Sequence, residues 1–138
     1  MRQGPLRWDQ PEDLDLHVVE PLAAGGSCEI WYGDTNRPVG TSGCGAKGSL
    51  DLDSNAGCSI DNVDIENVIY PSSQPAPSGT YTVRVDYFAH CSATTRVAYE
   101  LTVRANGHTS VFCGSFGIVD SDNGGAGSGV QVTTFTVP

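Results

Sequence analysis

The sequence has no apolar run approaching the ~20 residues that a membrane-spanning helix needs, so we expect no direct membrane insertion. Basic side chains are also scarce, with 7 Lys and Arg against 16 Asp and Glu and a formal net charge of −9. Nucleic acids and anionic membranes are bound through clustered basic side chains, so this balance argues against both as partners. The excess of carboxylates is compatible with bound metal cations, which would reduce their mutual repulsion.

Common catalytic motifs are absent as well. There is no G-x-S-x-G nucleophile turn, and the three histidines are scattered, with no H-E-x-x-H pair for a hydrolytic zinc ion. We therefore predict no catalytic residues and interpret the protein as non-catalytic. A small secreted hydrolase that cleaves sugars with paired carboxylates remains an alternative, because that chemistry depends on distance in space rather than on spacing in sequence.

The five cysteines form no C-x-x-C pair, which disfavours a zinc knuckle or a redox motif. Five cysteines beside one Met and one Lys favour a secreted, extracellular or periplasmic protein. Residues 1–5 lack the apolar core of a signal peptide, so the chain is either trimmed or one module of a longer protein. We expect two disulfides and one spare thiol, with the pairing open. The candidates are Cys44, Cys58, Cys91 and Cys113, and a bridge between Cys44 and Cys58 would brace the acidic loop between them.

Period-two alternation dominates the second half of the chain. Apolar residues occupy every second position in residues 80–87 and again in residues 97–103, which is typical of half-buried strands. Asn106-Gly107 follows and predicts a type I′ hairpin turn. In the last strand the apolar phase slips, which predicts a bulge near residues 133–134.

Shorter strands are expected upstream, over residues 13–19, 28–32 and 63–70, with Gly- and Ser-rich connections between them. No segment keeps a 3.6-residue period, so helix content should be small. The sequence predicts one domain over residues 1–138, an all-β antiparallel sandwich of about seven to nine strands, immunoglobulin-like or jelly-roll-like.

An acidic loop carries the most specific functional pattern. Asp51, Asp53 and Asn55 alternate and are followed by Gly57, the order in which a calcium loop presents its oxygens. The spacing is not that of an EF-hand, because the glycine stands at the seventh loop position and Asn62 at the twelfth. The alternative is that these residues only form Asx-turns.

Asp13 and Asp15 form a second acidic alternation. On a strand they share one face, about 6.5–7 Å apart at Cα, with His17 next in line. A shared cation would remove the repulsion between them, whereas on a solvated face that repulsion costs little. We predict a composite calcium site that joins two distant segments, with the ligands Asp13, Asp15, Asp51, Asp53, Asn55 and Glu66.

Two further candidate sites are weaker. Asp120 and Asp122 precede the last strand in a Gly-rich loop and could hold a second cation, although this is ordinary turn chemistry. Trp31 and Tyr32 are candidate binding aromatics, because adjacent residues of a strand face opposite sides and one of the two must point outward.

Several motifs, taken in order, resemble the YfaP-like bacterial domains of unknown function. The shared elements are Trp8, the run DLDLHV at residues 13–18, I-x-Y at residues 30–32, the acidic loop at residues 48–57, and G-x-Y-x-V-x-V-x-Y-F at residues 79–88. Residues 66–68 correspond to an E-N-I element of those domains, with Val68 in place of its Ile. Residues 58–61 are an insertion before Glu66. The resemblance implies a secreted or periplasmic β-sandwich module attached to larger surface or exported proteins, with Trp8 in the core.

Together these observations predict a non-catalytic extracellular module stabilised by calcium. It would present loops or a face for binding or adhesion to a protein or carbohydrate, or hold neighbouring domains or subunits. A structural subunit of a cell-surface assembly, joined through the spare cysteine or an edge strand, is the alternative.

Overall fold

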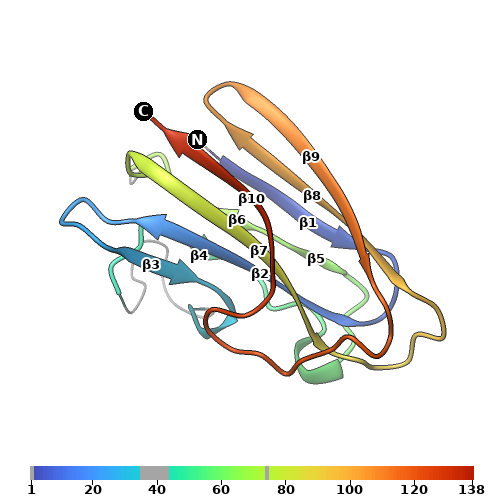
Figure 1. Ribbon diagram of the computed structural model, residues 1–138. Coiled ribbons are helices and arrows are strands. Elements are labelled where there is room, and N and C mark those ends of the chain that lie inside the picture. The colour runs from blue at the N-terminus through green and yellow to red at the C-terminus, as the bar shows by residue number, and fades with distance from the viewer. Residues whose placement is uncertain (1, 35–43, 74) are drawn as a thin grey trace.

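Two four-stranded antiparallel sheets pack face to face in the computed structural model, which describes residues 2–34, 44–73 and 75–138 (Figure 1). Sheet A has the order β5-β1-β8-β9 and sheet B the order β10-β7-β2-β3, while β4 and β6 form a small third sheet. The predicted antiparallel β-sandwich with minimal helix is confirmed. No helix in the described residues is long and apolar enough to cross a membrane. The strands are β1 (Arg2–Trp8), β2 (Asp13–Pro21), β3 (Ser27–Ile30), β4 (Ser49–Leu50), β5 (Ile65–Glu66), β6 (Val68–Ile69), β7 (Gly79–Ala89), β8 (Val97–Ala105), β9 (His108–Phe116) and β10 (Val130–Val137), with short 3-10 turns η1 (Tyr32–Asp34) and η2 (Ala56–Cys58).

The turn predictions agree with the observed pairing. Asn106 and Gly107 have φ angles of 55° and 76° and connect β8 to β9, with Ala105 opposite His108. The register of β10 against β7 shifts between Gln131 and Thr133, next to the predicted bulge.

The strands that the alternation did not predict are short or irregular. The single strand expected over residues 63–70 is divided between β5 in sheet A and β6, which pairs with β4. β1 was not predicted because its residues show no period-two alternation, and its pairing with β8 is interrupted between Gln3 and Leu6. These pieces raise the count in the described residues to ten strands, above the seven to nine expected.

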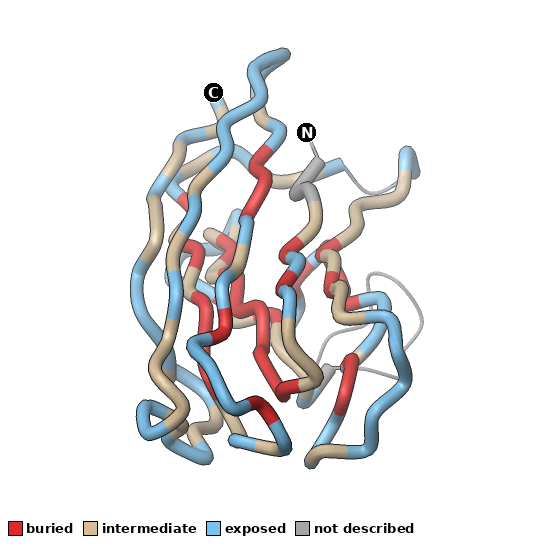
Figure 2. The backbone as a smooth tube through the Cα atoms, turned by 90° about the vertical axis from the view of Figure 1, so that its right-hand side faces the viewer, coloured by how far each residue is buried: buried red, intermediate tan, exposed pale blue. Residues whose placement is uncertain are grey.

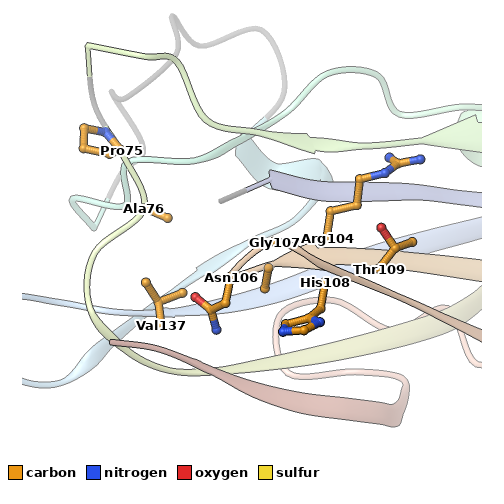
Figure 3. A pocket seen from close by; sticks show the side chains of 9 residues that line it. Pro75, Ala76, Arg104, Asn106, Gly107, His108, Thr109 and Val137 are labelled. Carbon is orange, nitrogen blue, oxygen red and sulfur yellow. The ribbon is translucent and has the colours of Figure 1, made fainter.

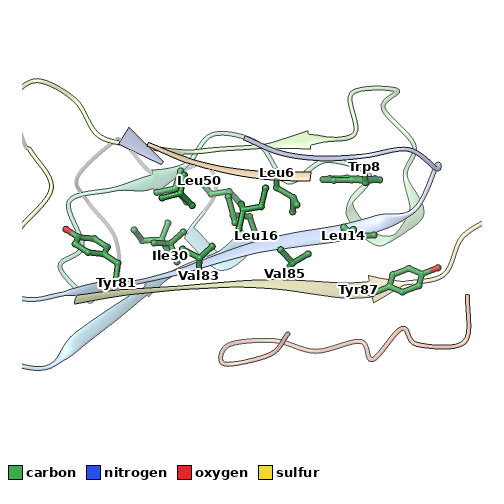
Figure 4. Packing of buried hydrophobic residues seen from close by; sticks show 14 of the residues in the cluster. Leu6, Trp8, Leu14, Leu16, Ile30, Leu50, Tyr81, Val83, Val85 and Tyr87 are labelled. Carbon is green, nitrogen blue, oxygen red and sulfur yellow. The ribbon is translucent and has the colours of Figure 1, made fainter. Parts of the chain in front are cut away.

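The core lies between sheets A and B (Figures 2 and 4). β2 contributes every second residue, Leu14, Leu16 and Val18, and these pack with apolar residues of β1, β7 and β8. Trp8 belongs to this core, as the sequence predicted, and so do Tyr81 and Tyr87 on β7. Because successive side chains of a strand point to opposite faces, residues 13, 15 and 17 of β2 face away from this core.

Glu12, in the turn between β1 and β2, connects several segments at one end of the sandwich. Its carboxylate is fully buried and accepts hydrogen bonds from the Tyr87 hydroxyl (2.9 Å) and from the backbone amides of residues 91–93. Its carbonyl accepts hydrogen bonds from Trp8 Nε1 and Asn55 Nδ2, both at 2.9 Å. Burial acts to raise the pKa of Glu12, but these hydrogen bonds outweigh it and lower that pKa.

The opposite end of the sandwich carries the Asn106-Gly107 turn and the last residues of β10. A hollow of about 500 Å³ lies there, lined by the turn together with Pro75 and Val137 (Figure 3). Because Asp13 pairs with Ala89 at one end of β7 and Val137 with Gly79 at the other, this hollow is distant from the acidic residues.

We predict that Glu12→Ala lowers the free energy of unfolding by about 3 kcal/mol or more, because three amides and a tyrosine hydroxyl lose a charged acceptor. Urea unfolding followed by tryptophan fluorescence measures the change. Glu100→Ala, which removes the same group from an exposed position on β8, is the control and should change the value by less than about 0.5 kcal/mol. Equal losses for the two variants would contradict this role.

Candidate metal centre

The outward face of β2 is acidic and nevertheless buried. Asp13, Asp15 and His17 alternate with the core residues of the strand, yet each is at most 1% exposed. β7 adds Asp86 directly opposite Asp15, also 1% exposed. Two neighbouring strands therefore bring three carboxylates and an imidazole onto one covered face of sheet B.

Aromatic side chains form much of the cover. Trp31 stacks on the His17 ring at a centroid distance of 6.0 Å and meets Tyr32 edge-on at 4.5 Å. Tyr32 in turn contacts Phe88 of β7 at 5.6 Å. The predicted binding aromatics Trp31 and Tyr32 are thus partly buried and lie over the acidic face.

The Gly-rich connection between β9 and β10 lies against the same face. The amide of Asp122 donates to the Tyr87 carbonyl at 3.0 Å, and the amide of Asn123 donates to the Phe88 carbonyl at 2.9 Å. Gly129 has a φ of 101°, and a Cβ there would come within 2.8 Å of the Val85 carbonyl oxygen. A glycine is therefore needed where this connection approaches β7.

Asp13, Asp15 and Asp53 offer carboxylate oxygens that lie within 4.8 Å of one another. They line a pocket of about 230 Å³ together with Tyr32, Gly57 and Phe88. The Gly57 amide donates to Asp13 Oδ2 at 2.8 Å, but Asp13 Oδ1 and both oxygens of Asp15 are buried and accept no hydrogen bond from an amide, a hydroxyl or a basic side chain. A hydrogen bond between Asp13 and Asp15 requires a proton on one of the two carboxyls. The acidic loop and β2 thus meet at a set of unsatisfied oxygens.

No Lys or Arg among the described residues forms an ion pair with these carboxylates. Arg84, which lies opposite His17 on β7, pairs with Glu29 at 3.3 Å. Burial, together with the charges of the neighbouring carboxylates, raises the pKa of Asp15 to about 9. Burial also raises the pKa of Asp13 to about 6 and that of Asp53 above its usual value. Without a cation the cluster must hold protons, because ionised carboxylates only accept hydrogen bonds and repel one another.

Glu66, a predicted ligand, lies near this cluster but has other partners. It is fully buried, and its two oxygens accept hydrogen bonds from the backbone amides of Leu16 at 2.8 Å and Ser54 at 3.2 Å. Burial and the charge of Asp15 raise its pKa well above the usual value. Glu66 therefore joins the acidic loop to a part of β2 that β3 does not reach.

The other two predicted ligands are directed elsewhere. Asp51 is exposed, and its carboxylate accepts hydrogen bonds from the backbone and side-chain nitrogens of Asn67. Asn55 has a φ of 58°, and its side chain bonds to the backbone of Glu12 and Asp61 and to the Asp64 carboxylate. The structure therefore brings Asp13, Asp15 and Asp53 together, while the side chains of Asp51 and Asn55 bond to residues outside this cluster, at least six positions away along the chain.

Asp120 and Asp122 also form local turn contacts. Asp120 Oδ2 accepts a hydrogen bond from the Gly117 amide, and Asp122 Oδ1 accepts one from the Gly124 amide, both at 2.8 Å. They are not among the metal-binding groups found in the described residues, although both line a hollow with Asp86.

The disulfides pair as Cys28–Cys44 and Cys58–Cys91, which settles the open pairing and corrects the candidate set, since Cys28 is bonded and Cys113 is not. The acidic loop is braced, but Cys58 reaches Cys91 beyond the end of β7 rather than Cys44. Cys113 is the free, exposed thiol, because it lies on the edge strand β9 of sheet A, and Cys28 takes the place expected for it.

The sequence analysis missed Asp86, and it noted His17 beside Asp13 and Asp15 without counting it among the ligands. Asp86 stands in the polar phase of its strand, which reads as a solvated face until the register shows it opposite Asp15. His17 continues the alternation of Asp13 and Asp15, and this spacing could have identified it as a further ligand on the same face. The burial of all four residues depends on loops that are distant in sequence.

A pH dependence of stability follows from the raised pKa values of Asp15, to about 9, and Asp86, to about 8. Between pH 7 and 9 the folded protein in excess chelator retains protons that the unfolded chain has released. Its free energy of unfolding should therefore fall as pH rises, by up to about 1.4 kcal/mol per pH unit for each carboxyl. Saturating calcium should reduce this slope by displacing the proton of Asp15. Chemical unfolding at several pH values tests this, and a level or rising stability in chelator would contradict it.

The Cys58–Cys91 bridge should support the cluster, since Cys58 follows the Gly57 amide that binds Asp13. We expect the double variant Cys58→Ser and Cys91→Ser to lose about 2–4 kcal/mol of stability and to bind calcium more weakly. Calorimetry with calcium and urea unfolding measure both effects. Cys113→Ser is the matched control and should change neither; unaltered calcium affinity in the double variant would refute the supporting role.

Comparison of the chain with protein-family models, with curated proteins and with solved structures finds no match in any of the three.

Proposed function

We propose that Asp13, Asp15 and Asp53 bind a calcium ion and that the protein is a non-catalytic extracellular module stabilised by this ion. One observation carries the proposal: both oxygens of the Asp15 carboxylate are buried between two other carboxylates and accept no hydrogen bond from an amide, a hydroxyl or a basic side chain. A buried charge without a partner costs several kcal/mol, and a divalent cation at this point would offset that cost.

The donor set favours calcium. All three side chains supply carboxylate oxygens, the hard ligands that Ca²⁺ prefers, and its flexible shell of 6–8 oxygens can be completed by backbone carbonyls and water. The pocket of about 230 Å³ is smaller than the roughly 300–1,000 Å³ typical of sites for organic ligands. Its size therefore supports an ion rather than a sugar at this point.

The proposed role of the ion is structural. It would tie β2, which carries Asp13 and Asp15, to the acidic loop, which carries Asp53. These two segments are already linked through Glu66 and the Gly57 amide. One end of the sandwich would then hold its loops rigidly, as presentation to a protein or carbohydrate partner requires.

An extracellular location is part of the proposal. Two disulfides support it, because they persist in oxidising compartments. The resemblance to the YfaP-like domains points in the same direction and remains a prediction.

A second candidate function is a subunit of a surface assembly. β9 is a nine-residue edge strand of sheet A, and it carries the free thiol of Cys113 and the exposed side chain of Val111. Edge strands and exposed thiols both offer contacts to another copy of a chain. Non-reducing electrophoresis together with sizing separates this function from that of a monomeric module.

Calcium should raise the unfolding midpoint of the wild-type protein above its value in excess chelator, because a ligand that binds only the folded state stabilises it. At 100-fold excess over the dissociation constant the stabilisation is about 2.7 kcal/mol. Differential scanning calorimetry with and without calcium measures it. We expect Asp53→Asn to remove most of the calcium-dependent shift.

Asp51→Asn is the matched control, because it removes the same charge from the same loop at a side chain that faces Asn67. It should keep the full calcium-dependent shift. A wild-type midpoint that does not respond to calcium would exclude the proposal, and so would an equal loss in the two variants.

A further inference from the structure

We propose that Asp15, His17 and Asp86 form a second metal site, for a borderline divalent transition metal such as Zn²⁺, next to the calcium site. The three residues offer one ligand atom each within 4.8 Å of one another, and each is at most 1% exposed. An imidazole nitrogen distinguishes this set from the all-oxygen set of Asp13, Asp15 and Asp53.

The register of sheet B creates the site. Asp15 lies directly opposite Asp86, and His17, two residues further along β2, lies opposite Arg84. Residues at i and i+2 on one strand share a face with the residue opposite, so these three side chains converge without any loop residue. The ligand set is therefore held by the most extensively paired strands of sheet B rather than by turns.

The hydrogen bonding of His17 leaves one ring nitrogen with a free lone pair. Nδ1 lies 3.0 Å from Glu29 Oε1, and since a carboxylate only accepts, Nδ1 must carry the proton. Nε2 is then the unprotonated nitrogen of a neutral imidazole. It is buried and has no hydrogen-bond partner. His17 also offers a ligand atom within 4.8 Å of the Asp15 and Asp86 carboxylates, and a buried imidazole nitrogen without a partner is available to a metal ion.

Glu29 acts as the orienting partner and is itself held in place. Its carboxylate accepts hydrogen bonds from Arg84 at 3.3 Å and from the backbone amide of Gly127 at 2.7 and 3.0 Å. Metal-binding histidines commonly donate their other N–H to a carboxylate, which fixes the ring orientation and makes the ligand more basic. The His17–Glu29 pair has this form.

The carboxylates supply the remaining unsatisfied atoms. Asp86 Oδ2 and both oxygens of Asp15 are buried without hydrogen-bond partners. One oxygen of Asp15 can face each cluster, so its carboxylate could bridge two ions. Asp122, whose side chain lies beside Asp86, could supply a further oxygen ligand.

One imidazole with carboxylates is a mixed set that suits Zn²⁺ and neighbouring transition metals, whereas Ca²⁺ takes oxygen ligands. The two sites share Asp15 but not their other ligands. His17 and Asp86 belong only to the proposed zinc site, and Asp53 belongs only to the proposed calcium site. The two sites can therefore be tested separately through their unshared residues.

The test is calorimetric titration of Zn²⁺ into protein saturated with calcium. The wild type should bind one Zn²⁺ per chain at this site, and His17→Gln and Asp86→Asn should each weaken zinc binding at least about 100-fold while calcium binding persists. Asp53→Asn should weaken calcium binding and leave zinc binding as in the wild type. His108→Gln, at the exposed start of β9, controls for adventitious zinc and should bind it as the wild type does. Wild-type zinc affinity in His17→Gln, or its loss in His108→Gln, would overturn the proposal.

A measurement on the wild type covers the case in which the variants fail to fold. In ¹⁵N-labelled protein the Nε2 resonance of His17 should shift on zinc addition, while its Nδ1 keeps its proton. An Nε2 resonance that does not change at saturating zinc would also overturn the proposal.

Discussion

The carboxylate of Asp15 is buried between Asp13, Asp53 and Asp86. Its burial requires that a proton, a hydrogen-bond donor or a cation compensate its charge. Removing a carboxylate from water costs several kcal/mol unless a donor or a cation replaces the water. Here neither oxygen accepts a hydrogen bond from an amide, a hydroxyl or a basic side chain, and Arg84 on the same face is paired with Glu29. The cluster must therefore hold protons or cations, and a divalent ion is the partner that suits its oxygens at neutral pH.

The rest of this end of the sandwich keeps Asp15 covered. Glu12 joins the β1–β2 turn to the segment after β7, and the Cys58–Cys91 bridge joins the acidic loop to that same segment. Glu66 links the loop to β2, and the aromatic pair Trp31 and Tyr32 covers the strand from the side of β3. A cation at Asp15 would add a further connection among segments that are already linked. This explains how a site can be both buried and built from distant parts of the chain.

Alternation along the strands predicted the sandwich, the hairpin at Asn106 and the shared face of Asp13 and Asp15, because a period of two follows directly from strand geometry. It could not separate Asp53 from Asp51, since the two differ only in where the loop backbone directs them: Asp51 towards Asn67, Asp53 towards β2. Asp86 and the partner of Cys58 depend on register and on loop paths, which no local pattern encodes. The sequence therefore predicted one strand of the site and left its partners undetermined.

The most direct measurement of the central claim is a high-resolution crystal structure of the protein grown with calcium. We expect a density peak with oxygens of Asp13, Asp15 and Asp53 at about 2.3–2.6 Å and a total of 6–8 oxygen ligands. A structure at the same calcium concentration with no ion between these carboxylates, and with Asp15 still buried and without a partner, would contradict it.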